Sequence, residues 1–182
     1  MTEWLAGLAV LALAGLAVWV FNQLVRDRNQ VSAAWSDIDV QLQRRHDLVP
    51  NLVSTVKAYA AHERETLERV VAERNASRKA RGVGERARHE GALEQSLTGL
   101  VALAEAYPDL KASENFAQLS AQLSEVEDHL QYARRFYNGS VRQYNTRIQQ
   151  FPHLLLARPF GFAEAEFFGA DADARRATAI AL

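Results

Sequence analysis

Apolar positions recur at helical spacing along almost the whole chain, and one segment is apolar on every side. Residues 4–21 (WLAGLAVLALAGLAVWVF) carry no charge. About 20 helical residues are enough to cross the ~30 Å hydrocarbon layer of a membrane. We therefore predict a transmembrane anchor over residues 1–25, with Trp4 at one membrane interface and Trp19 and Phe21 at the other.

A cleaved signal peptide is the alternative interpretation of this segment. Its first residues, MTE, include no basic side chain, and no small-residue cleavage site follows the apolar run, so we expect an anchor that is retained. Arg26 and Arg28 flank its C-terminal end, whereas the N-terminal tail has no Arg or Lys. The positive-inside rule then predicts a single-pass protein of the cell inner membrane, with its N-terminus outside and the rest in the cytoplasm.

Residues 26–151 have the pattern of an antiparallel helical bundle. Apolar stripes at helical spacing run through residues 31–42, 52–70 and 93–107. The longest stripe, over 116–151, alternates spacings of three and four, which is typical of helices that cross near 20°. Because no segment alternates as a strand would, we predict an all-α chain in which the anchor continues into an up-and-down four-helix bundle.

Helix ends are marked by residues with known capping or breaking effects. Gly82 and Gly84 offer left-handed backbone conformations and predict a break near residues 80–85. Pro108 ends the third stripe, Ser113 can cap the longest helix, and Pro152 stops it.

Pro50 lies within an otherwise helical pattern and is preceded by a cluster of charged residues. Arg44, Arg45 and His46 suit the carbonyl end of one helix, and Asp47 can cap the next, with Pro50 in its first turn. A tight corner here would give four helices of comparable length, so we favour it. A single kinked helix through Pro50 is the alternative.

The C-terminal part, residues 152–182, divides into two stretches. Residues 151–168 are apolar and aromatic and are interrupted by proline and glycine, whereas the last residues form a small polar tail. The apolar stretch either packs on the bundle or contacts a lipid surface or a partner. Its candidate contact residues are the last four phenylalanines, Phe160, Phe162, Phe167 and Phe168.

Two Tyr–Asn pairs repeat seven residues apart on the longest predicted helix. Tyr137 and Asn138 recur as Tyr144 and Asn145, so the two pairs lie on one side of that helix. Buried amides and phenols need hydrogen-bond partners. The pairs are therefore either a satisfied polar network in the core or a groove for a ligand or partner, and both interpretations stay open.

Composition narrows the chemistry that the chain can perform. A formal net charge of −1 over 182 residues provides no basic field for nucleic acid. The absence of cysteine excludes disulfides, thiolate metal sites and cysteine nucleophiles. HERET, residues 62–66, begins like a zinc helix but has Thr66 where the second histidine would stand. We therefore predict no catalytic, metal or cofactor site.

Three long blocks resemble the LemA family, and together with the anchor they extend over most of the chain. They are RNQVSAAWSDIDVQLQRRHDLVPNLVSTVKAYAAHE, AYPDLKASENFAQLSAQLSEVED and ARRFYNGSVRQYNTRIQQFP. The resemblance implies a transmembrane helix followed by a cytoplasmic four-helix bundle, with a mirror topology as one option. It implies no reaction, since the family has no established enzymatic activity. Some relatives are linked with membrane-organelle biogenesis or with genes for membrane proteases, which suggests a role at membranes.

We therefore expect a membrane-anchored, non-enzymatic scaffold or adaptor that presents its bundle to protein partners. The alternative function is a membrane-remodelling or envelope-organising protein whose aromatic C-terminal segment contacts lipid. Small residues on the anchor leave self-association into a homo-oligomer open, although no G-x-x-x-G motif supports it.

Overall fold

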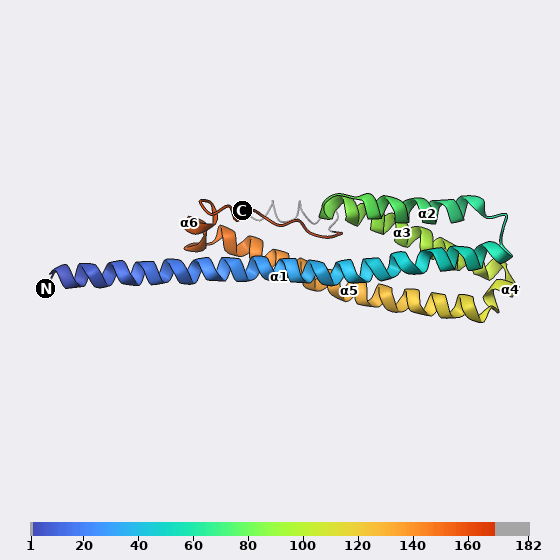
Figure 1. Cartoon of the computed structure of the whole chain (residues 1–182), viewed down its shortest axis with the longest axis horizontal. Helices are drawn as coiled ribbons and strands as arrows, with labels where there is room; N and C mark the ends of the chain where they lie inside the picture. Colours follow the sequence, from blue (N-terminus) through green and yellow to red (C-terminus); the bar gives the residue numbers. More distant parts are fainter. Residues whose placement is uncertain (1, 170–182) are drawn as a thin grey trace. The chain divides into compact units, whose positions relative to one another are not determined.

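The computed structural model describes residues 2–169, and these residues contain helices and no strand. The anchor and the first soluble stripe form one long helix, and a second long helix lies near the C-terminus (Figure 1). The elements are α1 (Thr2–Tyr59), α2 (Arg64–Lys79), α3 (Val83–Leu103), a 3₁₀ turn η1 (Ala104–Ala106), α4 (Pro108–Lys111), α5 (Glu114–Gln149) and α6 (His153–Ala157). The all-α prediction is confirmed for these residues.

Backbone contacts divide the chain into two compact units. Among the described residues, unit 1 combines 2–36 with Phe136–Glu166, and unit 2 combines Asp37–Arg135 with 167–169. The helices α1 and α5 each contribute to both units.

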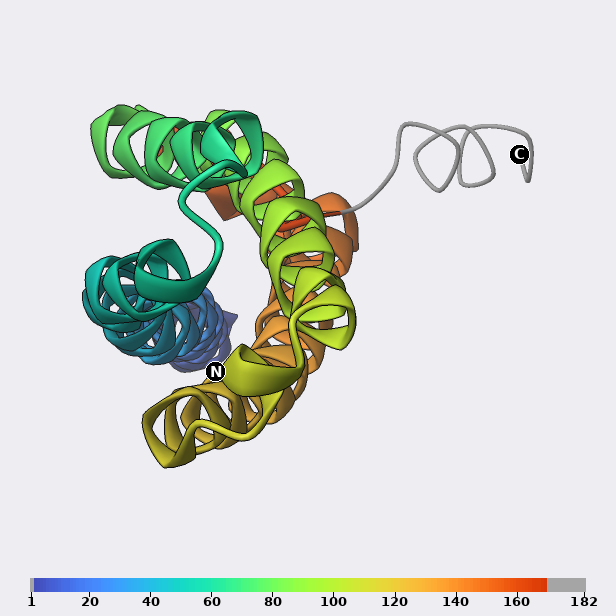
Figure 2. The same ribbon diagram turned by 90° about the vertical axis from the view of Figure 1, so that its right-hand side faces the viewer.

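Unit 2 has an aliphatic core to which four helical segments contribute, and Figure 2 looks along these segments. The predicted stripes supply its buried side chains. From α1 and α2 these are Val49, Leu52, Val56, Leu67 and Val70, and from α3 and α5 they are Leu93, Leu97, Leu100, Phe116 and Leu119. Helices α2 and α3 lie side by side in both views (Figures 1 and 2).

The predicted corner at Pro50 is wrong. Helix α1 passes through Pro50 without a break and ends at Tyr59, and the chain turns at residues 60–63 instead. Proline lacks an N–H, so the carbonyl four residues earlier, that of His46, loses its helical hydrogen bond. Arg74 of α2 replaces it: its Nε donates to the His46 carbonyl oxygen at 2.7 Å. The tertiary contact thus satisfies the group that the proline leaves unpaired.

The other predicted helix ends agree with the structure. Gly82 precedes α3 with a φ of 85°, in the left-handed region that favours glycine. The Ser113 hydroxyl oxygen accepts a hydrogen bond from the Phe116 N–H at 3.4 Å, as an N-cap does. Pro108 opens the short helix α4, where its missing N–H costs little.

Unit 1 packs α1 against the second half of α5 and the short helix α6 (Figure 1). Its buried core consists of Leu24, Tyr144, Ile148, Ala157 and Phe162. The predicted stripe of α5 is therefore confirmed as far as Ile148. Its last member, Phe151, is 80% exposed because it follows the end of the helix, so its assignment to the core is wrong. The predicted polar tail lies largely outside the described residues.

We expect Arg74 and Pro50 to be energetically coupled. Replacing Arg74 with Met should lower the free energy of unfolding by about 1–2 kcal/mol, because the His46 carbonyl loses its donor. In a Pro50→Ala background the alanine N–H can reach that carbonyl, so Arg74→Met should cost about 1 kcal/mol less. Urea unfolding of the four proteins in mild detergent measures this coupling. Equal costs in both backgrounds would contradict it.

Candidate functional site

A fully buried carboxylate, Glu90 on α3, lies at the centre of a polar network in unit 2. Its Oε2 accepts a hydrogen bond from the Arg45 guanidinium. Its Oε1 accepts from the Ser77 hydroxyl, and His46 Nε2 lies 2.7 Å from the same oxygen. Arg45 in turn donates to Glu127 of α5 at 2.8 Å. The network therefore joins α1, α2, α3 and α5.

The charge state of Glu90 follows from these contacts. Burial alone would raise the pKa of this carboxyl, but the hydrogen bond from His46, the charge of Arg45 and the bond from Ser77 together lower it to about 2. Glu90 is therefore an anion that only accepts hydrogen bonds, so His46 Nε2 must carry the proton between them.

Serine, histidine and a carboxylate also make up hydrolytic triads, but the connectivity here is different. In a triad the serine bonds the histidine, and the acid orients that histidine from its other nitrogen. Here Ser77 and His46 both contact the same oxygen of Glu90. All three side chains are also buried, with exposed fractions of 1% or less. This network can hold helices together, but it leaves Ser77 without a base.

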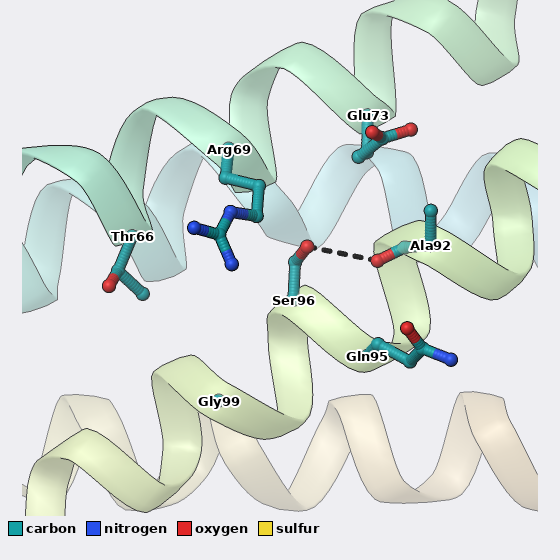
Figure 3. Close-up of a pocket in the computed structure, with 7 residues that line it drawn as sticks. All are labelled: Thr66, Arg69, Glu73, Ala92, Gln95, Ser96 and Gly99. Atoms are coloured by element: carbon teal, nitrogen blue, oxygen red, sulfur yellow. Dashed lines mark hydrogen bonds between the residues drawn. The ribbon is translucent and has the colours of Figure 1, made fainter.

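A shallow groove of about 260 Å³ lies between α2 and α3 of unit 2 (Figure 3). It is lined by Thr66, Arg69, Glu73, Ala92, Gln95, Ser96 and Gly99. Its reactive groups are already engaged: Ser96 donates to the Ala92 carbonyl at 2.9 Å, and Arg69 pairs with Glu65. The third, Glu73, accepts from His89 Nδ1 at 3.1 Å. Among the described residues, no group of three or more His, Asp or Glu side chains could hold a metal ion.

The predicted anchor residues all belong to unit 1. Trp4 and Trp19 are 82% and 58% exposed, and Phe21 is half-buried against Phe160 with 5.1 Å between ring centroids. Arg26 and Arg28 are exposed, and the Arg28 guanidinium lies over the Phe162 ring at 5.1 Å.

Within residues 2–169, one helix, α1, is long and apolar enough to cross a membrane. Its most apolar 18-residue window has a mean hydropathy of 2.3 and is 6% buried. Every residue of the segment 3–19 is exposed, and burial begins at Val20.

The Tyr–Asn repeat binds the chain's own C-terminal segment in unit 1. The Asn145 amide makes two hydrogen bonds to the backbone of Ala165, each at 2.9 Å, and the Tyr137 hydroxyl donates to the Glu166 carbonyl at 2.7 Å. Gln149 donates to the Glu164 carboxylate at 2.7 Å. Three α5 side chains thus hold residues 164–166 along the helix.

The remaining members of the repeat are also in unit 1. Tyr144 is buried in the core, and Asn138 is half-buried. Burial and the nearby charge of Glu166 raise the pKa of Tyr137 to about 12, and burial raises the pKa of Tyr144. Both phenols are therefore neutral at physiological pH, and Tyr137 keeps the proton that it donates.

The four candidate phenylalanines do not share one surface. Phe162 is buried in unit 1, and Phe160 is 59% exposed. The other two belong to unit 2: Phe167 is half-buried, and Phe168 is buried with the Arg134 guanidinium 5.4 Å from its ring centroid.

Sequence reasoning missed the Glu90 network, although the sequence contains a signal for it. Glu90 precedes Leu93 and Leu97 at helical spacing, and Arg45 lies three residues after Leu42 on the buried face of α1. An unpaired charge in the core is unfavourable, so opposite charges at core-facing positions of two helices indicate a buried ion pair between them.

Comparison with known proteins identifies relatives over most of the chain. The family model described as "LemA family" matches residues 34–181. The chain is 26% identical to magnetosome protein MamQ 2 of Paramagnetospirillum magneticum, over 88% of this chain and 69% of that protein. It is also 28% identical to protein LemA of Metamycoplasma hominis, over 71% of this chain and 60% of that protein.

We expect Glu90→Gln to lower the free energy of unfolding by about 3 kcal/mol, because Arg45 keeps its buried charge and loses its main counter-charge. Glu94→Gln is the matched control one turn along the same helix. Its pair with Arg134 is partly exposed, so that variant should lose less than about 1 kcal/mol. Chemical unfolding in detergent measures both, and similar losses in the two variants would contradict a central role for Glu90.

Acid should weaken the same network. Because the pKa of Glu90 is lower in the folded chain, its contribution is present above the ordinary value of 4.5 and is lost as the pH falls towards 2. The Glu90→Gln variant should lack this part of the acid dependence. A parallel decline of both proteins between pH 5 and pH 2, values chosen to bracket that titration, would contradict the assignment.

Replacing Asn145 with Asp should release the C-terminal segment from α5. The carboxylate cannot donate to the Ala165 carbonyl and would repel it, so one of the two hydrogen bonds becomes unfavourable. We expect faster protease cleavage within residues 158–169, seen by mass spectrometry, whereas Thr146→Ser at an exposed neighbouring position should leave the rate unchanged. Equal cleavage of the Asp variant and the parent would contradict this role.

Proposed function

The chain belongs to the LemA family, and we propose that it is a membrane-anchored, non-enzymatic helical scaffold that presents its helices to protein partners. In this proposal α1 crosses the inner membrane once, with its N-terminus outside, and unit 2 lies in the cytoplasm. The four helical segments of unit 2 act as an antiparallel up-and-down bundle.

The observation that carries the proposal is the change of character along α1. Residues 4–19 are exposed and uncharged, and most of them are apolar, which is unfavourable in water and favourable in hydrocarbon. The same helix then carries the buried positions Ile38, Leu42 and Val49. Anchoring confines these helices to a membrane surface, which raises the effective concentration for encounters with other membrane-bound proteins.

A non-enzymatic role is supported by the polar groups described above. Glu90 and its partners Arg45, His46 and Ser77 are buried. The reactive groups of the α2–α3 groove are already paired within their own helices or between α2 and α3. Some relatives are named as magnetosome proteins, and that name applies to those relatives. For this chain we propose only a role at a membrane.

A second candidate function has its own observation. Phe151, Leu155 and Phe160 are large, apolar and exposed in the segment that follows α5. They favour the alternative in which this segment contacts lipid directly and so organises the membrane surface.

Cysteine accessibility in intact cells tests the anchor and its orientation, since the chain has no cysteine of its own. Glu3→Cys should react with a membrane-impermeant maleimide, and Glu68→Cys, exposed on α2, should react only after permeabilisation. The reverse pattern would contradict the orientation. Recovery of the chain in the soluble fraction would contradict the anchor.

The scaffold role has a separate test. Full-length protein purified from its native membranes in mild detergent should carry a defined protein partner in constant ratio, measured by mass spectrometry. A chain that consistently purifies alone would contradict the role.

A further inference from the structure

The exposed apolar part of α1 ends before the full thickness of the hydrocarbon layer, and partly buried apolar residues such as Phe21 and Val25 continue it. Glu3 is charged and burial begins at Val20, so the exposed apolar segment 4–19 has about 16 residues and a length of ~24 Å at ~1.5 Å per residue. The hydrocarbon layer is ~30 Å thick. About one helical turn of hydrocarbon therefore remains beyond Trp19.

At the level of this next turn, the segment that follows α5 packs against one side of α1. Trp19 lies beside His153 of α6, with 6.3 Å between ring centroids, and Phe21 makes an edge-to-face contact with Phe160. His153 Nε2 is 2.8 Å from the Gln23 side-chain oxygen. The segment that follows α5 is thus fixed against the last apolar turn of the anchor.

Three large apolar side chains of that segment are exposed. Phe151, Leu155 and Phe160 are 80%, 63% and 59% exposed, and we call these three residues the apolar rim. Water is an unfavourable environment for three large apolar side chains in one short segment. The contact between Phe21 and Phe160 joins the rim to the anchor. In the anchored chain the rim therefore faces acyl chains and lipid headgroups.

The charges near the rim suit a lipid interface. Arg26, Arg28 and Arg158 are exposed and can meet lipid phosphates. Asp27, the acidic residue between the first two, is buried and paired with Arg147 at 3.0 Å. Burial and the charge of Arg147 lower the pKa of His153, so this ring is neutral at physiological pH and adds no charge beside the anchor.

We propose that the apolar rim inserts into the boundary between headgroups and acyl chains of a phospholipid bilayer, beside the last apolar turn of α1. The inference rests on the proposed anchor. It assigns the C-terminal segment to the lipid interface and not to a protein partner.

Site-directed spin labelling of the full-length protein in vesicles of phosphatidylethanolamine and phosphatidylglycerol tests the proposal. Nitroxides are attached to the single-cysteine variants Phe151→Cys, Leu155→Cys and Phe160→Cys. Leu8→Cys serves as the hydrocarbon reference, and Tyr132→Cys, 67% exposed in unit 2, serves as the aqueous reference. The ratio of collision rates with oxygen and with a water-soluble nickel chelate reports depth.

Each outcome decides a different part of the proposal. The rim positions should give ratios above that of Tyr132→Cys and below that of Leu8→Cys. Rim ratios equal to that of Tyr132→Cys, with Leu8→Cys still in hydrocarbon, would overturn the inference and leave the anchor intact. An aqueous ratio at Leu8→Cys would overturn the anchor and the inference with it.

Folding of the variants has its own control. The side chains of Phe151 and Leu155 are largely exposed, so their replacement should leave the thermal midpoint unchanged. They therefore provide the depth measurement even where Phe160→Cys loses its contact with Phe21.

Discussion

The structure of unit 2 depends on one ion in its interior, the carboxylate of Glu90. An ionised group leaves water only where hydrogen bonds and opposite charge replace its hydration. Arg45 and His46 supply these from α1, and Ser77 supplies a hydroxyl from α2. Aliphatic contacts are non-directional and tolerate sliding of one helix along another. The hydrogen bonds to the two carboxylate oxygens of Glu90 are directional, and we infer that they set the register of the helices around them.

His46 connects this ion to the proline of α1. Its ring contacts Glu90, and its carbonyl accepts the hydrogen bond from Arg74 that replaces the one removed by Pro50. His46 therefore contacts the buried charge with its side chain, and its backbone carbonyl is the group at which Arg74 compensates the proline. Both contacts reach from α1 to neighbouring helices, so the continuity of α1 through Pro50 and its packing against α2 and α3 support each other.

Sequence reasoning works for this chain where the cause is local and fails where it is not. Gly82 and Ser113 act on their own neighbours, so the helix ends they predict are found in the structure. The corner predicted at Pro50 is wrong because Arg74, which donates to the carbonyl that Pro50 leaves unpaired, is 24 positions further along the sequence. Asp47 does not cap a helix: it is exposed and accepts a hydrogen bond from Gln43 within α1.

In unit 1 the sequence predicts which face of α5 is buried, but it does not predict which groups the polar side chains of α5 bind. The periodic pattern places Tyr137 and Tyr144 on the buried side, but it contains no information on what Asn145 would bind. The answer, the backbone of Ala165, lies beyond a proline-interrupted turn that has no period. A backbone segment carries no sequence signature as a hydrogen-bond partner, since every residue offers the same N–H and C=O.

The docking of this segment has a consequence for the apolar residues before it. Asn145 and Tyr137 hold residues 165–166 to α5, and the chain before them lies beside the last apolar turn of α1, where His153 contacts Trp19 and Phe160 contacts Phe21. In this segment Phe162 is buried, whereas Phe160 is 59% exposed. Exposure of a phenylalanine at that position is unfavourable in water and favourable at a bilayer surface. In our proposal the two polar side chains on α5 therefore hold one end of the segment that contacts lipid.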